Sequence, residues 1–179
     1  YFDDKNFSSI LENLDGVRNK KKIRLRWYGG KHKLDNPMLE IKDKDATVTK
    51  KTNYNVDQLN GVSILDKKGL EFIKDTINKI VNTKSIIYPV LTTNYDRQYF
   101  ISNNNKVRAT VDYNLQSIYL KNFSQLNMIK NFVYKCILEI KYPTNIDSYV
   151  RENLKNMTLR LSKNSKFINS AVDTPSFIF

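Results

Sequence analysis

Residues Lys20–Tyr28 read KKKIRLRWY and are followed by Gly29-Gly30, which is a turn signal. Charged and apolar side chains alternate along this segment, and a period of two is typical of a strand that buries one face. One face carries Lys22, Arg24, Arg26 and Tyr28, and the other carries Ile23, Leu25 and Trp27. The segment therefore predicts a strand with one basic face and one apolar face.

Further strands are predicted around this segment. Alternating or β-rich stretches cover Met38–Lys44, Ala46–Tyr54, Ser85–Ile101, Lys106–Tyr113 and Tyr134–Tyr142. The first two follow each other closely enough to form a hairpin, and an Asn-Asn-Asn turn at residues 103–105 predicts another. The opening residues Tyr1–Asp4 resemble the end of a strand.

Helices are predicted in two places. Asp66 can cap a helix that runs to about Thr83, because apolar side chains recur at helical spacing at Leu70, Ile73, Ile77, Ile80 and Val81. Asn145–Met157 predicts a second helix. Leu115–Phe132 shows no single period and predicts short strand and helix pieces, and Ser162–Ser170 reads as a basic segment. The pattern as a whole predicts an α+β fold.

Composition excludes several kinds of site. The 179 residues include 30 Lys and Arg against 18 Asp and Glu, which gives a net charge of +12. Cys136 and His32 are the only residues of their types, so a disulfide framework, a cysteine or histidine-cluster zinc site and a Ser-His-Asp triad are not expected. No apolar run approaches the roughly 20 residues that a membrane-spanning helix needs. We expect a soluble domain in a reducing, cytoplasmic compartment, with Cys136 buried and a polyanion as partner.

The polar faces of the predicted strands are strongly basic. They carry Arg24, Arg26, Lys42, Lys51, Arg108 and Lys141, with Glu40 and Glu139 as acidic members. An ordinary solvated sheet face remains an alternative for any single strand. Like charges side by side repel, however, unless a polyanion neutralises them, and arginine forks suit phosphate oxygens. A closed barrel with basic residues inside and helices outside would satisfy both faces.

The motifs RLRWYGG, LEIK, YDR, VRATVD, a second LEIK and SKNSKF follow in this order between residues 24 and 167. In order and spacing the chain resembles the polyphosphate polymerase domain of the vacuolar transporter chaperone (VTC) family, within the triphosphate tunnel metalloenzyme, or CYTH-like, superfamily. The resemblance covers nearly the whole chain. It implies a single domain over residues 1–179, with the family's first strand missing at the N-terminus.

The resemblance also implies a fold and a reaction. The fold would be an antiparallel β-barrel that forms a tunnel, with helices packed outside. In the family, the γ-phosphate of ATP is transferred to a growing polyphosphate chain, ADP leaves, and Mn²⁺ or Mg²⁺ assists. The expected partners are ATP and polyphosphate or triphosphate, together with a membrane protein that takes up the polymer and associates the domain with a membrane.

The resemblance assigns roles to individual residues. Arg24, Arg26 and Lys42 would bind the triphosphate, and Arg97 and Arg108 would form the opposite wall, so these five are the expected catalytic residues. Lys22, Lys51, Lys141, Lys163 and Lys166 would add phosphate contacts. Glu139 of the second LEIK would be the metal ligand, and Glu40 shares the inward face with these cations.

Two departures from the family, the missing first strand and a change in the third strand, keep alternatives open. The third strand of the family carries Lys-x-Arg where this chain has Lys51 and Asn53, so one phosphate contact is lost or is supplied by Lys50. A triphosphatase of the same superfamily and a catalytically inactive polyphosphate-binding module are the alternative functions. A nucleic-acid-binding domain ranks last, because the aromatic residues lie mainly on the apolar faces and do not interleave with the basic ones.

Overall fold

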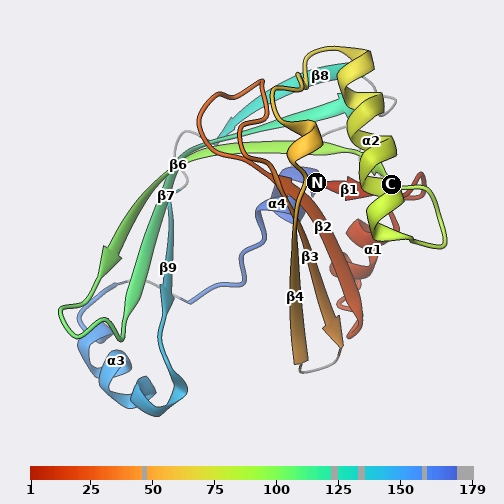
Figure 1. Ribbon diagram of the computed structural model, residues 1–179. Coiled ribbons are helices and arrows are strands. Elements are labelled where there is room, and N and C mark those ends of the chain that lie inside the picture. Colours follow the sequence, from red (N-terminus) through yellow and green to blue (C-terminus); the bar gives the residue numbers. More distant parts are fainter. Residues whose placement is uncertain (46–47, 122–124, 133–135, 159–160, 173–179) are drawn as a thin grey trace. The chain divides into compact units, whose positions relative to one another are not determined.

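A computed structural model of the chain describes residues 1–45, 48–121, 125–132, 136–158 and 161–172 (Figure 1). These residues form two sheets and four α-helices, so the predicted α+β class with antiparallel pairing is confirmed. No closed barrel is found among them, and the predicted barrel is therefore not confirmed. None of the helices in these ranges is both long enough and apolar enough to cross a bilayer.

The first sheet has the strand order β4-β3-β2-β1-β5. Its strands are β1 (Phe2–Asp3), β2 (Lys20–Arg26), β3 (Met38–Asp45), β4 (Val48–Asn55) and β5 (Tyr88–Pro89). The β2–β3 and β3–β4 pairs are antiparallel over their full lengths, which confirms the hairpin predicted from the alternating segments.

The second sheet has the order β6-β7-β8, with β9 paired to β7. Its strands are β6 (Leu91–Ile101), β7 (Arg108–Lys121), β8 (Gln125–Phe132) and β9 (Ile137–Lys141). The prediction for Leu115–Phe132 was wrong, because one long strand continues to Lys121 and another begins at Gln125. Buried residues occupy both faces of Ser117–Leu120, so no alternation marks this part of the strand.

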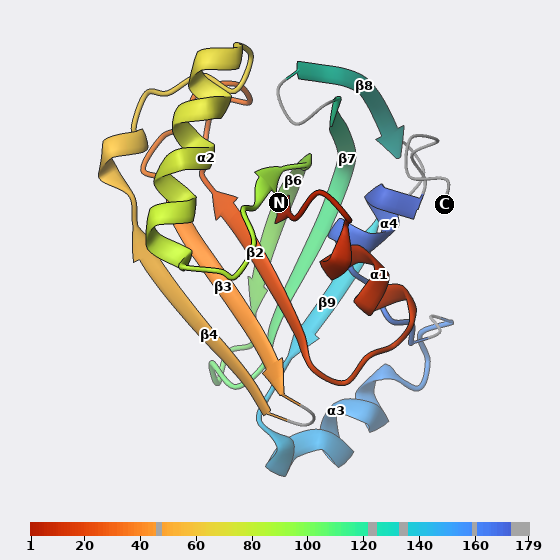
Figure 2. The same ribbon diagram turned by 90° about the vertical axis from the view of Figure 1, so that its right-hand side faces the viewer.

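Helix α2 (Lys67–Val81) covers the apolar face of the first sheet (Figure 2). As predicted, Asp66 caps it, and the Asp66 carboxylate accepts a hydrogen bond from the Gly69 amide at 2.7 Å. The core between helix and strands contains Ile23, Leu25, Leu39, Ile41, Leu70, Ile73 and Ile77. The buried residues therefore fix which face of β2–β4 stays polar.

The remaining helices are α1 (Ser8–Leu14), α3 (Asp147–Leu154) and α4 (Lys166–Val172). Short 3-10 turns span Asp57–Leu59 and Thr144–Ile146. A second core cluster joins Ile10 of α1 to Phe167 and Ala171 of α4, and the ring of Tyr1 stacks on that of Phe167 at 4.7 Å. Helix α3 falls inside the predicted helical range, whereas α1 and α4 were not predicted.

The described residues divide into two compact units. Unit 1 comprises Tyr1–Thr93, Ser117–Lys130 and the chain from Lys166 onward, and unit 2 comprises Asn94–Gln116 and Asn131–Ser165. A single domain over residues 1–179 stays a prediction.

Candidate functional site

The polar face of β2, β3 and β4 in unit 1 is arranged in rows of directly opposed residues. From one end of the strands to the other, the rows are Lys20–Lys44–Thr49, Lys22–Lys42–Lys51, Arg24–Glu40–Asn53 and Arg26–Met38–Asn55. Seven of these side chains are basic and one, that of Glu40, is acidic. The predicted phosphate-binding residues of these strands therefore lie on one face, together with Lys20 and Lys44, which were not predicted.

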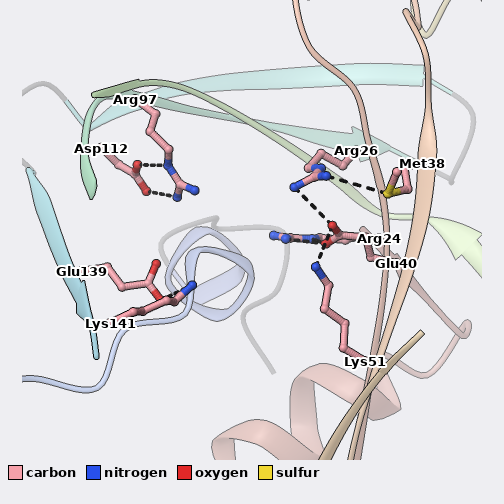
Figure 3. Close-up of polar contacts among 9 residues, drawn as sticks. All are labelled: Arg24, Arg26, Met38, Glu40, Lys51, Arg97, Asp112, Glu139 and Lys141. Carbon is pink, nitrogen blue, oxygen red and sulfur yellow. Dashed lines mark hydrogen bonds and ion pairs between the residues drawn. The ribbon is translucent and has the colours of Figure 1, made fainter. Parts of the chain in front are cut away.

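Glu40 is the centre of this face. Its side chain is 3% exposed, and Figure 3 shows three cations directed at its carboxylate. Arg24 donates to Oε2 through Nε at 2.6 Å, Arg26 Nη1 lies 3.3 Å from Oε1, and Lys51 Nζ lies 3.0 Å from Oε1. We call these four residues the arginine cluster. The predicted location of Glu40 among the cations is confirmed.

The contacts of the arginine cluster shift the pKa values of Glu40 and Arg24. Burial raises the pKa of Glu40, but the charges of Arg24 and Arg26 and the hydrogen bond from Lys51 outweigh it and hold that pKa below its usual value. Burial lowers the pKa of Arg24, whereas Tyr1 and Glu40 raise it, and the net result is a pKa above the usual range. The Glu40 carboxylate and the Arg24 guanidinium are therefore charged at neutral pH.

Lys22 lies in the neighbouring row, directly opposite Lys42. Burial, followed by the positive charges of Lys20 and Lys42, lowers its pKa to about 8. A fraction of this lysine is therefore neutral at slightly alkaline pH. An anion bound to this face would restore its charge.

Arg26 keeps unused hydrogen-bonding capacity. Its Nε is buried and has no hydrogen-bond partner. Its Nη2 lies 3.8 Å from the sulfur of Met38, which is a weak acceptor, and its guanidinium lies 5.1 Å from the ring centre of Tyr28. A buried guanidinium N–H without a strong acceptor favours a bound oxyanion at this point of the face.

In unit 2, Arg97 is held by a buried carboxylate. Its Nε and Nη2 donate to the two oxygens of Asp112 at 2.5 and 2.8 Å, as Figure 3 shows. Asp112 is 1% exposed, and the rings of Tyr95 and Tyr99 lie 5.2 and 5.8 Å from the guanidinium. Hydrogen bonding to Asp112 is the largest effect on Arg97 and raises its pKa above the usual range. The role of Asp112 as partner of Arg97 was not predicted.

Strands β7 and β9 bring the other predicted residues of unit 2 together. Arg108 is opposite Lys141, and Thr110 is opposite Glu139, so the two cations are adjacent. Lys141 Nζ lies 3.2 Å from Glu139 Oε1, and the buried Thr110 Oγ1 has no hydrogen-bond partner. Like charges directly opposite each other destabilise a strand pair, which again favours an anionic ligand.

The last two predicted lysines lie apart from these rows along the chain. Lys163 is exposed in the segment before α4 and belongs to unit 2, whereas Lys166 is the first residue of α4 and belongs to unit 1. Cys136 is exposed, so its predicted burial was wrong. Within the described part of the chain, no group of three His, Cys, Asp or Glu side chains is placed to hold a metal ion.

Comparison with known protein families identifies the class to which this fold and site belong. The family model described as the VTC domain matches residues 1–172. The chain therefore belongs to the VTC domain family, as its motifs predicted, and this membership links it to polyphosphate metabolism. Comparison with curated protein sequences gives no match.

Proposed function

We propose that this domain is a polyphosphate polymerase, which transfers the γ-phosphate of ATP to a growing polyphosphate chain and releases ADP. The observation that carries the proposal is the polar face of β2–β4. Seven basic side chains lie on it with a single acidic one, the buried Glu40. Membership of the VTC domain family supports a phosphate polymer as the matching anion. In this proposal the strands close into the barrel of the family and the basic faces line its tunnel.

The chemistry requires positioning and charge neutralisation more than a protein nucleophile. The bond between the γ-phosphorus and the β–γ bridging oxygen breaks, the electron pair leaves with ADP, and a terminal oxygen of the polyphosphate forms the new bond to phosphorus. Arg24 and Arg26 are held rigidly by Glu40, so their free N–H groups are oriented before the substrate binds. Lys22 and Lys42 would neutralise the adjacent phosphates as point charges.

The residues around Glu139 fit a hard divalent cation. Mg²⁺ in phosphoryl-transfer sites is usually held by one or two carboxylates together with substrate phosphates and water. Glu139 offers one exposed carboxylate, and the unpartnered Thr110 Oγ1 on the opposite strand could accept a hydrogen bond from a metal-bound water. A bound Mn²⁺ or Mg²⁺ would supply Lewis-acid polarisation of the transferred phosphoryl group. Lys141 would hold the Glu139 carboxylate in place from beside it.

The partners and location expected from the family are part of the proposal. ATP and polyphosphate would be the ligands of the domain. A membrane protein that takes up the polymer would place the domain at the cytoplasmic side of a membrane.

The test is to incubate the full-length protein with ATP and Mn²⁺ and to analyse the products by gel electrophoresis and phosphorus NMR. We expect a polyphosphate ladder and the release of one ADP for each phosphoanhydride bond formed in the polymer. Arg24→Ala and Arg24→Lys should both abolish or strongly reduce the ladder, because neither keeps the two-nitrogen contact with Glu40. Lys84→Ala removes an exposed lysine outside the basic face and should leave the ladder unchanged.

Two other outcomes would replace the proposal. Free phosphate without polymer would identify a triphosphatase. Polyphosphate binding without turnover would identify an inactive binding module, which the replacement of the family's third-strand arginine by Asn53 favours.

A further inference from the structure

We propose that one end of the polar face of β2–β4, beyond the arginine cluster, is a site for the base of a nucleoside triphosphate. Tyr28 would stack on the base, and Asn55 would hydrogen-bond to its edge. The inference rests on the proposed function, because the arginine cluster is taken to hold the phosphates of ATP. It adds the recognition of the nucleoside, to which no residue has been assigned so far.

Tyr28 lies on the polar side of the sheet. The preceding Trp27 packs against the core cluster of unit 1, and its Nε1 donates a hydrogen bond to the Gly30 carbonyl oxygen at 2.9 Å. The backbone around Tyr28 is therefore anchored from the core side. The ring of Tyr28 lies with its centre 5.1 Å from the Arg26 guanidinium and is 60% exposed. An exposed ring on an anchored backbone can stack on a planar ligand.

The two residues after Tyr28 leave its surroundings open. Both are glycines, so neither has a side chain that could cover the ring. Gly29 has a φ of +84°, a left-handed conformation that residues with a Cβ rarely adopt. A Cβ at Gly30 would meet no atom within 4 Å beyond its chain neighbours. A ligand can therefore approach this end of the polar face.

The polar face changes its chemical character along the strands. The two rows at one end contain five lysines and one threonine. At the other end Met38 and Asn55 stand opposite each other in the row of Arg26, and the position on β4 opposite Glu40 is Asn53. A bare phosphate chain carries charge along its whole length, whereas a nucleotide ends in an uncharged heterocycle. The uncharged residues beside Tyr28 therefore match a nucleotide better than a phosphate polymer.

Arg26 lies between the arginine cluster and Tyr28. Its Nη1 is 3.3 Å from Glu40 Oε1, its Nη2 is directed at the Met38 sulfur (Figure 3), and its buried Nε has no hydrogen-bond partner. Arg24 and Tyr28 are four residues apart, which is at most about 14 Å of extended chain. In ATP the ribose and the α- and β-phosphates separate the γ-phosphate from the base. One nucleotide can therefore contact both the arginines and Tyr28.

Asn55 supplies the polar contact for the edge of the base. It is exposed and lies in the same row as Arg26, beside the end of the face that Tyr28 occupies. Its side-chain amide carries both donors and an acceptor, which is the complement of the N6 and N7 atoms of adenine. Tyr54, the preceding residue, stands opposite the buried Leu39 and so belongs to the other face of the sheet.

The test measures how variants of the full-length protein bind a non-hydrolysable ATP analogue and tripolyphosphate. Calorimetry is carried out with a chelator, so that no metal contributes. Tyr28→Ala removes the ring, Tyr28→Phe keeps it, and Asn55→Ala removes the amide. Tyr54→Ala is the matched control, because it removes a partly exposed tyrosine ring from the opposite face of the same strands. Circular dichroism confirms that all four variants fold.

We expect Tyr28→Ala to bind the ATP analogue about tenfold more weakly than the wild type and tripolyphosphate equally well. Tyr28→Phe and Tyr54→Ala should bind both ligands as the wild type does. Asn55→Ala should weaken binding of the analogue about threefold and leave tripolyphosphate unchanged. In turnover, Tyr28→Ala should raise the KM for ATP with little change in kcat, because the base does not take part in the reaction.

Other results would overturn the base site. Equal losses for both ligands in Tyr28→Ala would mean that the ring acts through Arg26, and a loss in Tyr28→Phe as large as in Tyr28→Ala would mean that stacking is not the contact. An equal loss in Tyr54→Ala would remove the link to the polar face. A polyphosphate ladder that forms in spite of these results would leave the polymerase proposal intact. Conversely, analogue binding that depends on Tyr28, without any polymer from ATP, would support the base site and overturn the polymerase.

Discussion

Arg24 and Glu40 are directly opposed on β2 and β3. The guanidinium donates to Oε2 through Nε at 2.6 Å, and its Nη2 lies 2.5 Å from the same oxygen. The other oxygen, Oε1, is left for Arg26 and Lys51. One buried carboxylate thus orients three cations by dividing its two oxygens among them. This division keeps the cations close together without neutralising them, which is the electrostatic requirement of a polyanion site.

Glu40→Gln is expected to destabilise the protein by about 1–2 kcal/mol at neutral pH. Loss of one partner from a buried ion pair usually costs more, but the cations around Glu40 are between one-third and one-half exposed and are partly screened. Urea unfolding of both proteins measures the difference. Glu71→Gln, which breaks an exposed helical ion pair with Lys67, should change the unfolding free energy by less than about 0.5 kcal/mol.

Glu40→Gln should also change the dependence of the unfolding free energy on pH. Because the folded protein holds the pKa of Glu40 below 4.5, the carboxylate contributes stability that is fully present above that pH. This contribution is lost as the pH falls through the lower pKa of the folded state. The difference in unfolding free energy between wild type and Glu40→Gln should therefore shrink on acidification, and a constant difference would contradict the assignment.

Lys22 should make polyphosphate binding depend on pH at slightly alkaline pH. Burial and the charges of Lys20 and Lys42 lower its pKa to about 8 in the free protein. A bound anion should raise this pKa again. Binding at pH 8 should therefore take up protons, and one unit above the pKa the affinity should be reduced by up to about tenfold. Calorimetry in two buffers of different ionisation enthalpy measures the proton uptake.

The matched variant for this effect is Lys22→Arg, which keeps the charge at every accessible pH. Its affinity for tripolyphosphate should stay level where that of the wild type falls. An identical fall in both proteins would assign the titration to another group.

Glu139→Gln should reduce metal-dependent turnover by about 100-fold or more, because it removes the carboxylate proposed to hold the cation. Tripolyphosphate binding in the presence of a chelator should be nearly unchanged, since no metal contributes there. Glu152→Gln, an exposed carboxylate of α3 paired with Lys155, is the control and should retain activity. Loss of chelator-resistant binding would indicate that Glu139 organises Lys141 and not a metal.

Gly69→Ala should destabilise the first sheet and its helix by about 1–3 kcal/mol. A Cβ at this position would lie 2.0 Å from the backbone oxygen of Ser63, and backbone atoms cannot give way cheaply. Lys68→Ala, at the preceding exposed position of the same helical turn, should be close to neutral. The midpoints of urea unfolding decide between these expectations.

The sequence predicts this fold best where one face of an element is buried. Alternation in Lys20–Tyr28 and Met38–Lys44 predicts β2, β3 and their shared basic face, and Asp66 with its helical spacing predicts α2. The later part of strand β7 was misread because it is buried on both sides, so its residues do not alternate. Helices α1 and α4 are seven residues each, which is too short for a clear period.

The candidate site was predictable in its residue types but not in its pairing. Motif order singled out Arg24, Arg26 and Arg97, and strand parity put Glu40 on the same face as Arg24 and Arg26. Which carboxylate serves which arginine depends on register and side-chain reach, which alternation does not specify. The row that contains Lys20 and Lys44 was missed because Lys20 belongs to no motif. Only the strand register shows that the two lysines lie opposite each other.

The opposed faces of β3 have a consequence for how this gene can vary. A strand alternates with a period of two, so a single residue inserted or deleted at the start of β3 would turn Leu39 and Ile41 away from the core and move Glu40 into it. Evolution can adjust the charge of this face by point substitution, but it cannot change the length of the strand by one codon. Homologous genes should therefore differ in length outside β2 and β3 and not within them.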